Sequence, residues 1–178
     1  MKIREEVAYL TERYIKFSVE DIEGYGIDGG EKFGGTSVFF FPDEETMNRY
    51  KDRDAIGDRP VLFWKEVDGA IHVMKPDGTE VNDLSAYQHL GYITVLIVAD
   101  IVSRGEDLVA PAKKLKEMGA SSVYAYATHI EVAALDDANG TLQAGFEKRL
   151  IEELFTADLV FEETGGYITY IHPAYVSR

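Results

Sequence analysis

The chain has 178 residues, of which 46% are hydrophobic and 28% charged, as expected for a globular protein with one full core. Its formal net charge of −14 excludes a nucleic-acid partner, because binding to a phosphate backbone requires clustered lysine and arginine. The absence of cysteine excludes disulfides, thiolate zinc sites and cysteine nucleophiles. We therefore predict a single domain over residues 1–178.

Nothing in the sequence is typical of a membrane or export segment. The N-terminal segment is charged throughout. The longest apolar stretch, Tyr92–Ala99, is less than half of the roughly 20 residues that a membrane-spanning helix needs. We expect a cytoplasmic protein without a membrane partner.

Apolar residues recur at three- and four-residue steps between Ile3 and Phe17, which predicts an amphipathic first helix. A glycine-rich segment, Gly24–Gly35, follows and contains the pattern GxGxxG. A dinucleotide-binding loop needs a strand before this pattern and a helix after it, whereas here a helix precedes it and further glycines oppose a second one. We interpret residues 1–35 as a helix followed by a flexible connector or flap.

The next segments alternate between strand and helix patterns. The apolar run Ser37–Phe41 predicts a buried strand, and Pro42 with Asp43 predicts the start of a helix that continues to about Arg53. Pro60–Lys65 predicts a second strand. A hairpin is expected over Ala70–Val81, with Pro-Asp-Gly at its turn.

The most apolar strand, Tyr92–Val98, is expected at the centre of a parallel sheet that is covered on both faces. A helical stripe that ends at Met118 separates it from a further strand, Ser122–Thr128. Right-handed strand–helix–strand crossovers dominate in such sheets. We therefore predict that Val95–Val98 and Val123–Ala127 are adjacent parallel strands.

Leucines and a phenylalanine at helical spacing predict a helix over Thr141–Leu154, and strands over Leu159–Phe161 and Tyr167–Ile171 are expected to complete the sheet. Strands that alternate with helices in this way indicate an α/β fold with a central, mostly parallel sheet flanked by helices.

The apolar run that ends at Asp100 leads into a short loop, Ser103–Gly105, and then directly into a helix. In open α/β sheets ligands bind at the carboxyl ends of the strands. A helix that starts there directs its free N–H groups toward a bound phosphate. The pattern therefore predicts a phosphate-binding loop.

Four segments extend this pattern, and their sequences are SVFFFPDEETMNRYKD, FWKEV, ITVLIVADIVSRGEDL and GASSVYAYATH. Their order and spacing resemble the type I phosphoribosyltransferase family. They are most like the C-terminal half of ribose-phosphate pyrophosphokinase, the synthetase of phosphoribosyl pyrophosphate (PRPP). The resemblance covers roughly residues 36–164 and implies the type I phosphoribosyltransferase fold and a role in nucleotide metabolism.

The resemblance also implies a site. If the protein is active, Lys65, Asp100 and His129 are the catalytic candidates. The ligand-binding candidates are Asp43, Asp100, Ser103, Arg104 and Gly105. Mg²⁺ would be the cofactor, held indirectly through Asp100, and PRPP, ribose 5-phosphate or a nucleotide would be the ligand of a homo-oligomer.

The chain departs from the family pattern at the ribose-phosphate subsite. The family has two adjacent acids, of which only Asp100 is present, because Ala99 occupies the first position. Glu106 and Asp107 stand where the family has small residues next to the 5-phosphate. A carboxylate about 4 Å from a phosphate costs about 1 kcal/mol per charge pair in water and about 4 kcal/mol at intermediate dielectric.

The other subsites depart in the same direction. Glu45 and Thr46 replace the glycines on the diphosphate side, Val67 replaces an arginine two residues after Lys65, and Ile130 replaces the glycine after His129. In all four places the chain has fewer cations, fewer glycines or more carboxylates than the family.

Three classes of function fit these observations. We favour a PRPP synthetase-like protein with degenerate subsites and weak or no catalysis. The alternatives are an active phosphoribosyltransferase or pyrophosphokinase with an unusual substrate, and an interaction or assembly protein that reuses the fold. Purely structural roles for the candidate site residues stay open too. Asp100 could cap the helix after its loop, and Arg104 could pair with Glu106 or Asp107. Lys65 and His129 could also be structural.

Overall fold

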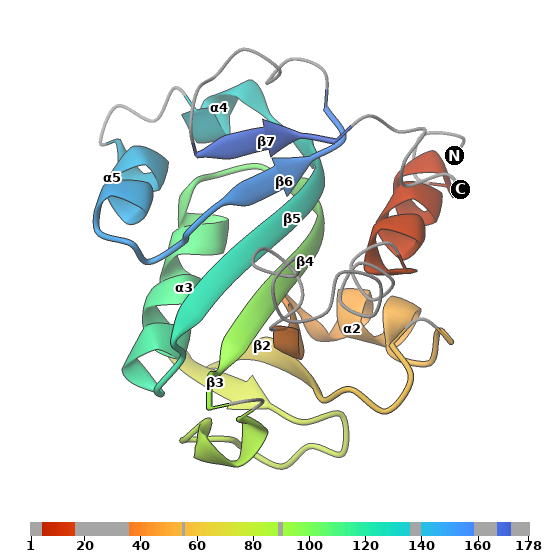
Figure 1. Cartoon of the computed structure of the whole chain (residues 1–178), viewed down its shortest axis with the longest axis vertical. Coiled ribbons are helices and arrows are strands. Elements are labelled where there is room, and N and C mark those ends of the chain that lie inside the picture. Colours follow the sequence, from red (N-terminus) through yellow and green to blue (C-terminus); the bar gives the residue numbers. More distant parts are fainter. Residues whose placement is uncertain are drawn as a thin grey trace.

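The computed structural model describes residues 5–16, 36–54, 56–88, 91–135, 140–158 and 167–171. A seven-stranded sheet in the order β3-β2-β1-β4-β5-β6-β7 forms the centre of the molecule (Figure 1). Its strands are β1 (Thr36–Phe41), β2 (Val61–Val67), β3 (Ala70–Met74), β4 (Thr94–Val102), β5 (Ser122–Ile130), β6 (Leu154–Thr156) and β7 (Ile168–Tyr170). All neighbouring strands pair in parallel except β2 and β3.

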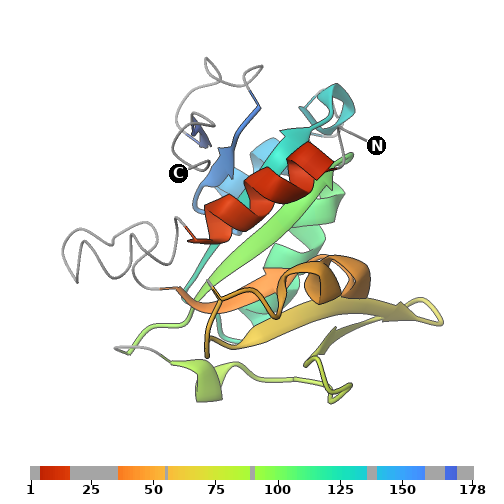
Figure 2. The same cartoon turned by 90° about the vertical axis from the view of Figure 1, so that its right-hand side faces the viewer.

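Helices cover both faces of this sheet. The labelled helices are α2 (Glu44–Tyr50), α3 (Glu106–Glu117), α4 (Val132–Leu135) and α5 (Thr141–Glu147), and a 3-10 turn spans Ser85–Tyr87. A further helix covers residues 5–16 and lies with α2 on one face, while α3 and α5 lie on the other (Figure 2). None of the described helices is long and apolar enough to cross a bilayer.

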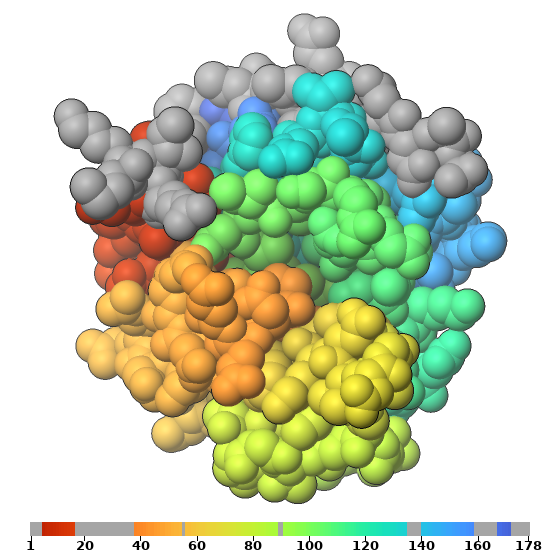
Figure 3. Space-filling view, turned by 180° about the vertical axis from the view of Figure 1, so that it is seen from behind, coloured from red at the N-terminus to blue at the C-terminus, as the bar shows by residue number. Residues whose placement is uncertain are grey.

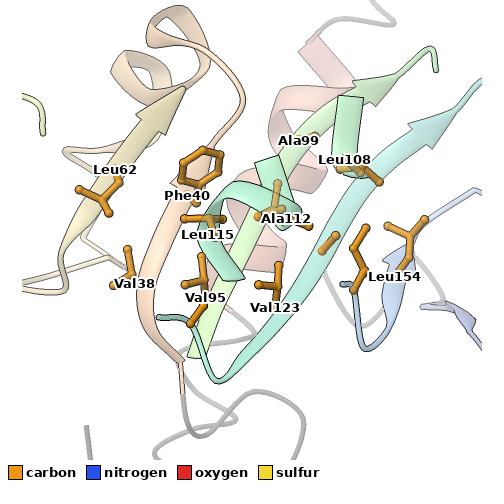
Figure 4. Packing of buried hydrophobic residues seen from close by; sticks show 14 of the residues in the cluster. Val38, Phe40, Leu62, Val95, Ala99, Leu108, Ala112, Leu115, Val123 and Leu154 are labelled. Carbon is orange, nitrogen blue, oxygen red and sulfur yellow. The ribbon is translucent and has the colours of Figure 1, made fainter. Parts of the chain in front are cut away.

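The prediction for the centre of the sheet is confirmed, because β4 and β5 are adjacent and parallel with Val95 opposite Val123. Side chains of β4 alternate between two separate cores, as the pleat of a strand requires. Val95, Ile97 and Ala99 face α3, whose Ala112 and Leu115 pack on them (Figure 4). Leu96 and Val98 face α2 and the first helix.

The predicted hairpin also forms. An isolated bridge joins Met74 to Glu80 across the Pro-Asp-Gly turn, and the Val81 N–H donates to the Val73 carbonyl at 2.8 Å. On its other side, β3 pairs antiparallel with β2. The glycine-rich segment Gly24–Gly35 lies outside the described residues.

Residues 5–16 form the predicted first helix, and the helix is fixed to β5 by buried polar contacts as well as apolar ones. The Tyr14 ring stacks on that of Tyr126 with centroids 3.7 Å apart. The hydroxyl of Thr11 donates to the Val7 carbonyl at 2.9 Å and contacts the Thr128 hydroxyl at 2.8 Å. Tyr126 contacts the same Thr128 hydroxyl at 2.8 Å, so a chain of hydroxyls connects β5 to the helix.

We expect Thr11→Val to destabilise the protein by about 1 kcal/mol, because it keeps the volume of the side chain but leaves the buried Thr128 hydroxyl with one partner fewer. Thr11→Ser keeps the hydroxyl and is the matched control. Equilibrium unfolding in urea measures both variants. A loss as large for serine as for valine would show that the methyl group, and not the hydroxyl, anchors the helix.

The prediction for the C-terminal third is wrong in part. The helix predicted over Thr141–Leu154 ends at Glu147, and Arg149 adopts a left-handed backbone with φ of 57° that turns the chain. Leu154 then begins β6, which the helical spacing had concealed. The strand predicted at Tyr167–Ile171 is present as β7, and residues 159–161 lie outside the described part.

Candidate ligand-binding site

Two cavities open at the carboxyl ends of the parallel strands, one on each side of β1 and β4. The α3-side cavity has a volume of about 540 Å³ and lies between Trp64, Ala99 and the start of α3. The α2-side cavity has a volume of about 440 Å³ and lies between the first helix, α2 and Asp100. Pro42, Asp43 and Ile101 border both cavities.

Asp100 lines the α2-side cavity, and groups of the chain itself occupy its carboxylate. The Tyr50 hydroxyl donates to one oxygen at 2.6 Å, and the Arg49 guanidinium forms an ion pair with the other. Burial and the hydrogen bond to Asp100 raise the pKa of the Tyr50 phenol, which keeps it protonated and donating. Asp100 therefore does not cap the helix after its loop, as one interpretation of the sequence had it.

The loop between β4 and α3 is closed by an acid of its own helix. The Asp107 carboxylate accepts the backbone N–H of Arg104 at 3.0 Å and lies 3.4 Å from the Arg104 guanidinium. Glu106 and Asp107 occupy the first turn of α3, as predicted. Arg104 precedes Gly105, the N-cap residue of α3, so the Asp107 carboxylate reaches back beyond the helix into the loop. The Arg104 N–H, in the loop that the sequence predicts to bind phosphate, therefore donates to a carboxylate of the chain itself.

Gly105 has a packing role in this loop. A Cβ atom at this position would lie 3.1 Å from both the Cβ and the backbone N of Leu142, and 3.5 Å from the Ala134 carbonyl oxygen. The start of α3 therefore approaches the start of α5 too closely for a larger residue. This contact explains the glycine without a bound ligand.

We expect Gly105→Val to lower the free energy of unfolding by roughly 1–3 kcal/mol, because its branched side chain would overpack the contact with Leu142. Ser103→Val, in an exposed position of the same loop, should change stability by less than about 0.5 kcal/mol. Thermal unfolding of the two variants tests this. Equal stability of Gly105→Val and wild type would restore a ligand-binding reason for the glycine.

Asp43 and Lys65 lie at the same end of the sheet as Asp100. Asp43 is the N-cap of α2 and accepts the backbone N–H of Thr46 at 2.7 Å. The pairing of Phe41 with Phe63 places Lys65 level with Asp43, and the alternation of β2 directs its exposed side chain to the face that carries α2.

His129 lies near the end of β5, and its Nδ1 contacts the Asp158 carboxylate at 2.7 Å. The same carboxylate accepts the backbone N–H of Ile130 at 3.4 Å. Asp158 thereby connects the chain after β6 to the end of β5. The histidine ring is half exposed and has a structural partner.

The structure thus divides the predicted site residues between two faces of the sheet. Asp43 borders both cavities, Arg104 lines the α3-side cavity, and Asp100 lines the α2-side cavity. Lys65, Ser103, Gly105 and His129 line neither of these two cavities. Arg104 and Asp100 therefore line different cavities, because successive residues of a strand point to opposite faces of the sheet.

The residues around Asp100 do not fit the implied Mg²⁺ ion. Mg²⁺ requires oxygen ligands in near-octahedral geometry, and both oxygens of Asp100 already contact Tyr50 and Arg49. Within the described ranges, no group of three or more His, Asp or Glu residues is arranged to hold a metal ion.

Sequence reasoning missed the residues that neutralise the site. Arg49 and Tyr50 are 51 and 50 residues from Asp100 along the chain, and no local pattern connects them. The Asp107 contact is local in sequence, because it joins a loop residue to an acid only three residues later.

Neither a family model nor a curated protein sequence matches this chain. Its fold is similar to the crystal structure of phosphoribosylpyrophosphate synthetase from Mycobacterium smegmatis, with a TM-score of 0.57 and 21% sequence identity. The match covers 80% of this chain and 43% of that one, so the chain spans less than half of the length of that structure. The chain therefore has the PRPP synthetase-like phosphoribosyltransferase fold that its motifs predict.

Proposed function

We propose that this protein is a PRPP synthetase-like protein of nucleotide metabolism with weak or no catalytic activity. Its ribose-phosphate and diphosphate subsites are degenerate. The observation that carries the proposal is the contact between the Asp107 carboxylate and the Arg104 N–H, which occupies the loop in which the fold would bind the 5-phosphate.

The physical reason for weak phosphate binding is repulsion between a phosphate and the acids at the start of α3. A helix N-terminus favours an anion by about 0.3–1 kcal/mol at an exposed position. A second anion beside Asp107 and Glu106 would meet a repulsion of about 1–4 kcal/mol for each charge pair, depending on the dielectric. Repulsion therefore exceeds what the helix end contributes, and a phosphate binds only if Asp107 leaves the loop or becomes protonated.

The ribose side supports the same conclusion. Ala99 offers no hydrogen bond to a sugar hydroxyl, and the Asp100 carboxylate would have to give up the Arg49 ion pair and the Tyr50 hydrogen bond before it could accept one. On the diphosphate side, the Thr46 N–H is taken by Asp43. Contacts within the chain thus occupy the Asp100 carboxylate and the Thr46 N–H, on the two sides where PRPP would bind.

A melting experiment tests the proposal. A ligand that binds only the native state raises its stability by RT ln(1 + [L]/Kd). We expect no shift of the melting temperature with PRPP, ribose 5-phosphate or ATP, each at about 1 mM with Mg²⁺. A rise of several degrees with any one of them would favour the active-enzyme interpretation with that compound as substrate or product.

A further inference from the structure

The α3-side cavity is a formed hollow at the ligand-binding end of the sheet. Its volume of about 540 Å³ lies within the range of small-molecule sites, about 300–1,000 Å³. The space-filling view shows the face on which the segment after β1, the β2–β3 hairpin and the start of α3 meet around it (Figure 3).

The lining of this cavity combines apolar walls with negative charge. The side chains of Trp64, Leu108 and Pro111 contribute apolar surface. Four carboxylates and one guanidinium also line the cavity, which gives it a net negative charge. They belong to Asp43, Glu66, Glu106, Asp107 and Arg104.

The cation in the cavity is already neutralised. Arg104 pairs with Asp107, and its backbone N–H donates to the same carboxylate. Among the described residues, the side chains of Glu66 and Glu106 have no hydrogen-bond or ion-pair partner. The charge that faces an incoming ligand is therefore negative, which disfavours a phosphate and favours a cation.

Trp64 supplies the second recognition element. It is half-buried, packs edge-to-face against Phe40 with ring centroids 6.3 Å apart, and contributes to the cavity wall. A tryptophan ring attracts cations through its negative face more strongly than the other aromatic rings do. An aliphatic chain would lie against the apolar wall formed by Leu108 and Pro111 while its charged end meets the carboxylates.

From the volume of this open cavity, the indole in its wall and the sign of its charge, we infer that the α3-side cavity binds a small organic cation, an alkylammonium or alkylguanidinium, in place of a phosphorylated sugar. The inference rests on the proposed function in one respect, namely that the site has lost the ligand of its fold. Different results would refute the proposed function and this inference. Binding of ribose 5-phosphate would overturn the proposed function, whereas failure of an organic cation to bind would overturn this inference alone.

The chain offers a built-in reporter, because Trp64 is its single tryptophan. Agmatine, which joins an amine and a guanidinium through a four-carbon chain, is the probe. We expect agmatine to change the Trp64 fluorescence in a saturable way with a dissociation constant at or below about 1 mM. Guanidinium ion at the same concentrations carries the charge without the aliphatic body and should give no saturable change.

The variant Glu66→Gln/Glu106→Gln should weaken agmatine binding at least tenfold. The control Glu44→Gln/Glu117→Gln removes two exposed carboxylates from outside the cavity and should leave the dissociation constant within a factor of two. If both variants weaken agmatine binding equally, the cation binds to the acidic surface in general and not to the cavity, which would overturn the inference. Absence of a saturable fluorescence change in the wild type would likewise overturn the inference.

Discussion

Replacing Asp100 with alanine should lower the free energy of unfolding by roughly 2–3 kcal/mol. The substitution leaves the part-buried Tyr50 hydroxyl and the Arg49 guanidinium without the carboxylate that both contact, and an unsatisfied buried donor costs about 1–3 kcal/mol, with more for a charged group. For a chain of this length each kcal/mol corresponds to about 2–4 °C in melting temperature. Calorimetric or optical melting should therefore show a decrease of roughly 5–10 °C.

The control for this experiment is Asp52→Ala. Asp52 is 84% exposed and pairs with Lys51, and such surface pairs contribute about 0–1 kcal/mol. The comparison separates two roles of Asp100. A carboxylate whose role is to bind a ligand often contributes nothing to stability or lowers it. Its removal would therefore leave the melting temperature unchanged or raise it. A variant as stable as wild type would contradict the assignment of Asp100 as an internal anchor.

Restoring the family pattern should create a PRPP site. The variant Ala99→Asp/Glu106→Gly/Asp107→Thr adds a sugar-binding carboxylate and removes two acids from the start of α3, which frees the Arg104 N–H that Asp107 now accepts. Removing two carboxylates beside a dianion recovers a few kcal/mol at intermediate dielectric, and each 1.4 kcal/mol is a factor of ten in affinity. We expect PRPP to bind in the presence of Mg²⁺ at least 100-fold more tightly than to wild type.

A matched control for the triple variant is Glu117→Gln, which changes the net charge by the same amount at the exposed, opposite end of α3. It should leave PRPP binding as it is in wild type. If the triple variant folds but binds no PRPP, the loop carboxylates are not what prevents binding, and the assembly interpretation of the fold gains support.

The centre of the fold could be predicted from the sequence because burial on both faces leaves a continuous apolar run. β4 and β5 carry such runs and flank a helix with a regular apolar stripe, so their adjacency and direction followed from the right-handed crossover rule. Capping chemistry is local as well, and Asp43 was correctly expected at the start of α2.

The C-terminal third could not be predicted in the same way. Leu150 and Leu154 continue the helical spacing of Leu142 and Phe146, but the chain turns at Arg149 and pairs Leu154 with Ile168 in the sheet. Tertiary pairing decides this segment, and hydrophobic periodicity alone does not separate a short strand from the end of a helix.

The sequence predicted where the site residues lie but not which charged groups they pair with. The motif order placed Asp100 and the loop at the carboxyl end of the sheet, where the structure has them. The partners of these groups, Arg49 for Asp100 and Asp158 for His129, come from distant segments that meet only in the folded chain. Sequence therefore located the groups but could not show that the chain neutralises them itself.

Titration of the wild-type protein with PRPP and Mg²⁺ in an isothermal calorimeter tests the central claim most directly. The internal contacts of Asp100, Asp107 and Asp43 predict no binding heat, or a dissociation constant weaker than about 1 mM, at neutral pH and moderate salt. A dissociation constant in the micromolar range would contradict the account, because it would require the chain to release these contacts at a cost smaller than the binding free energy of about 8 kcal/mol that such an affinity represents.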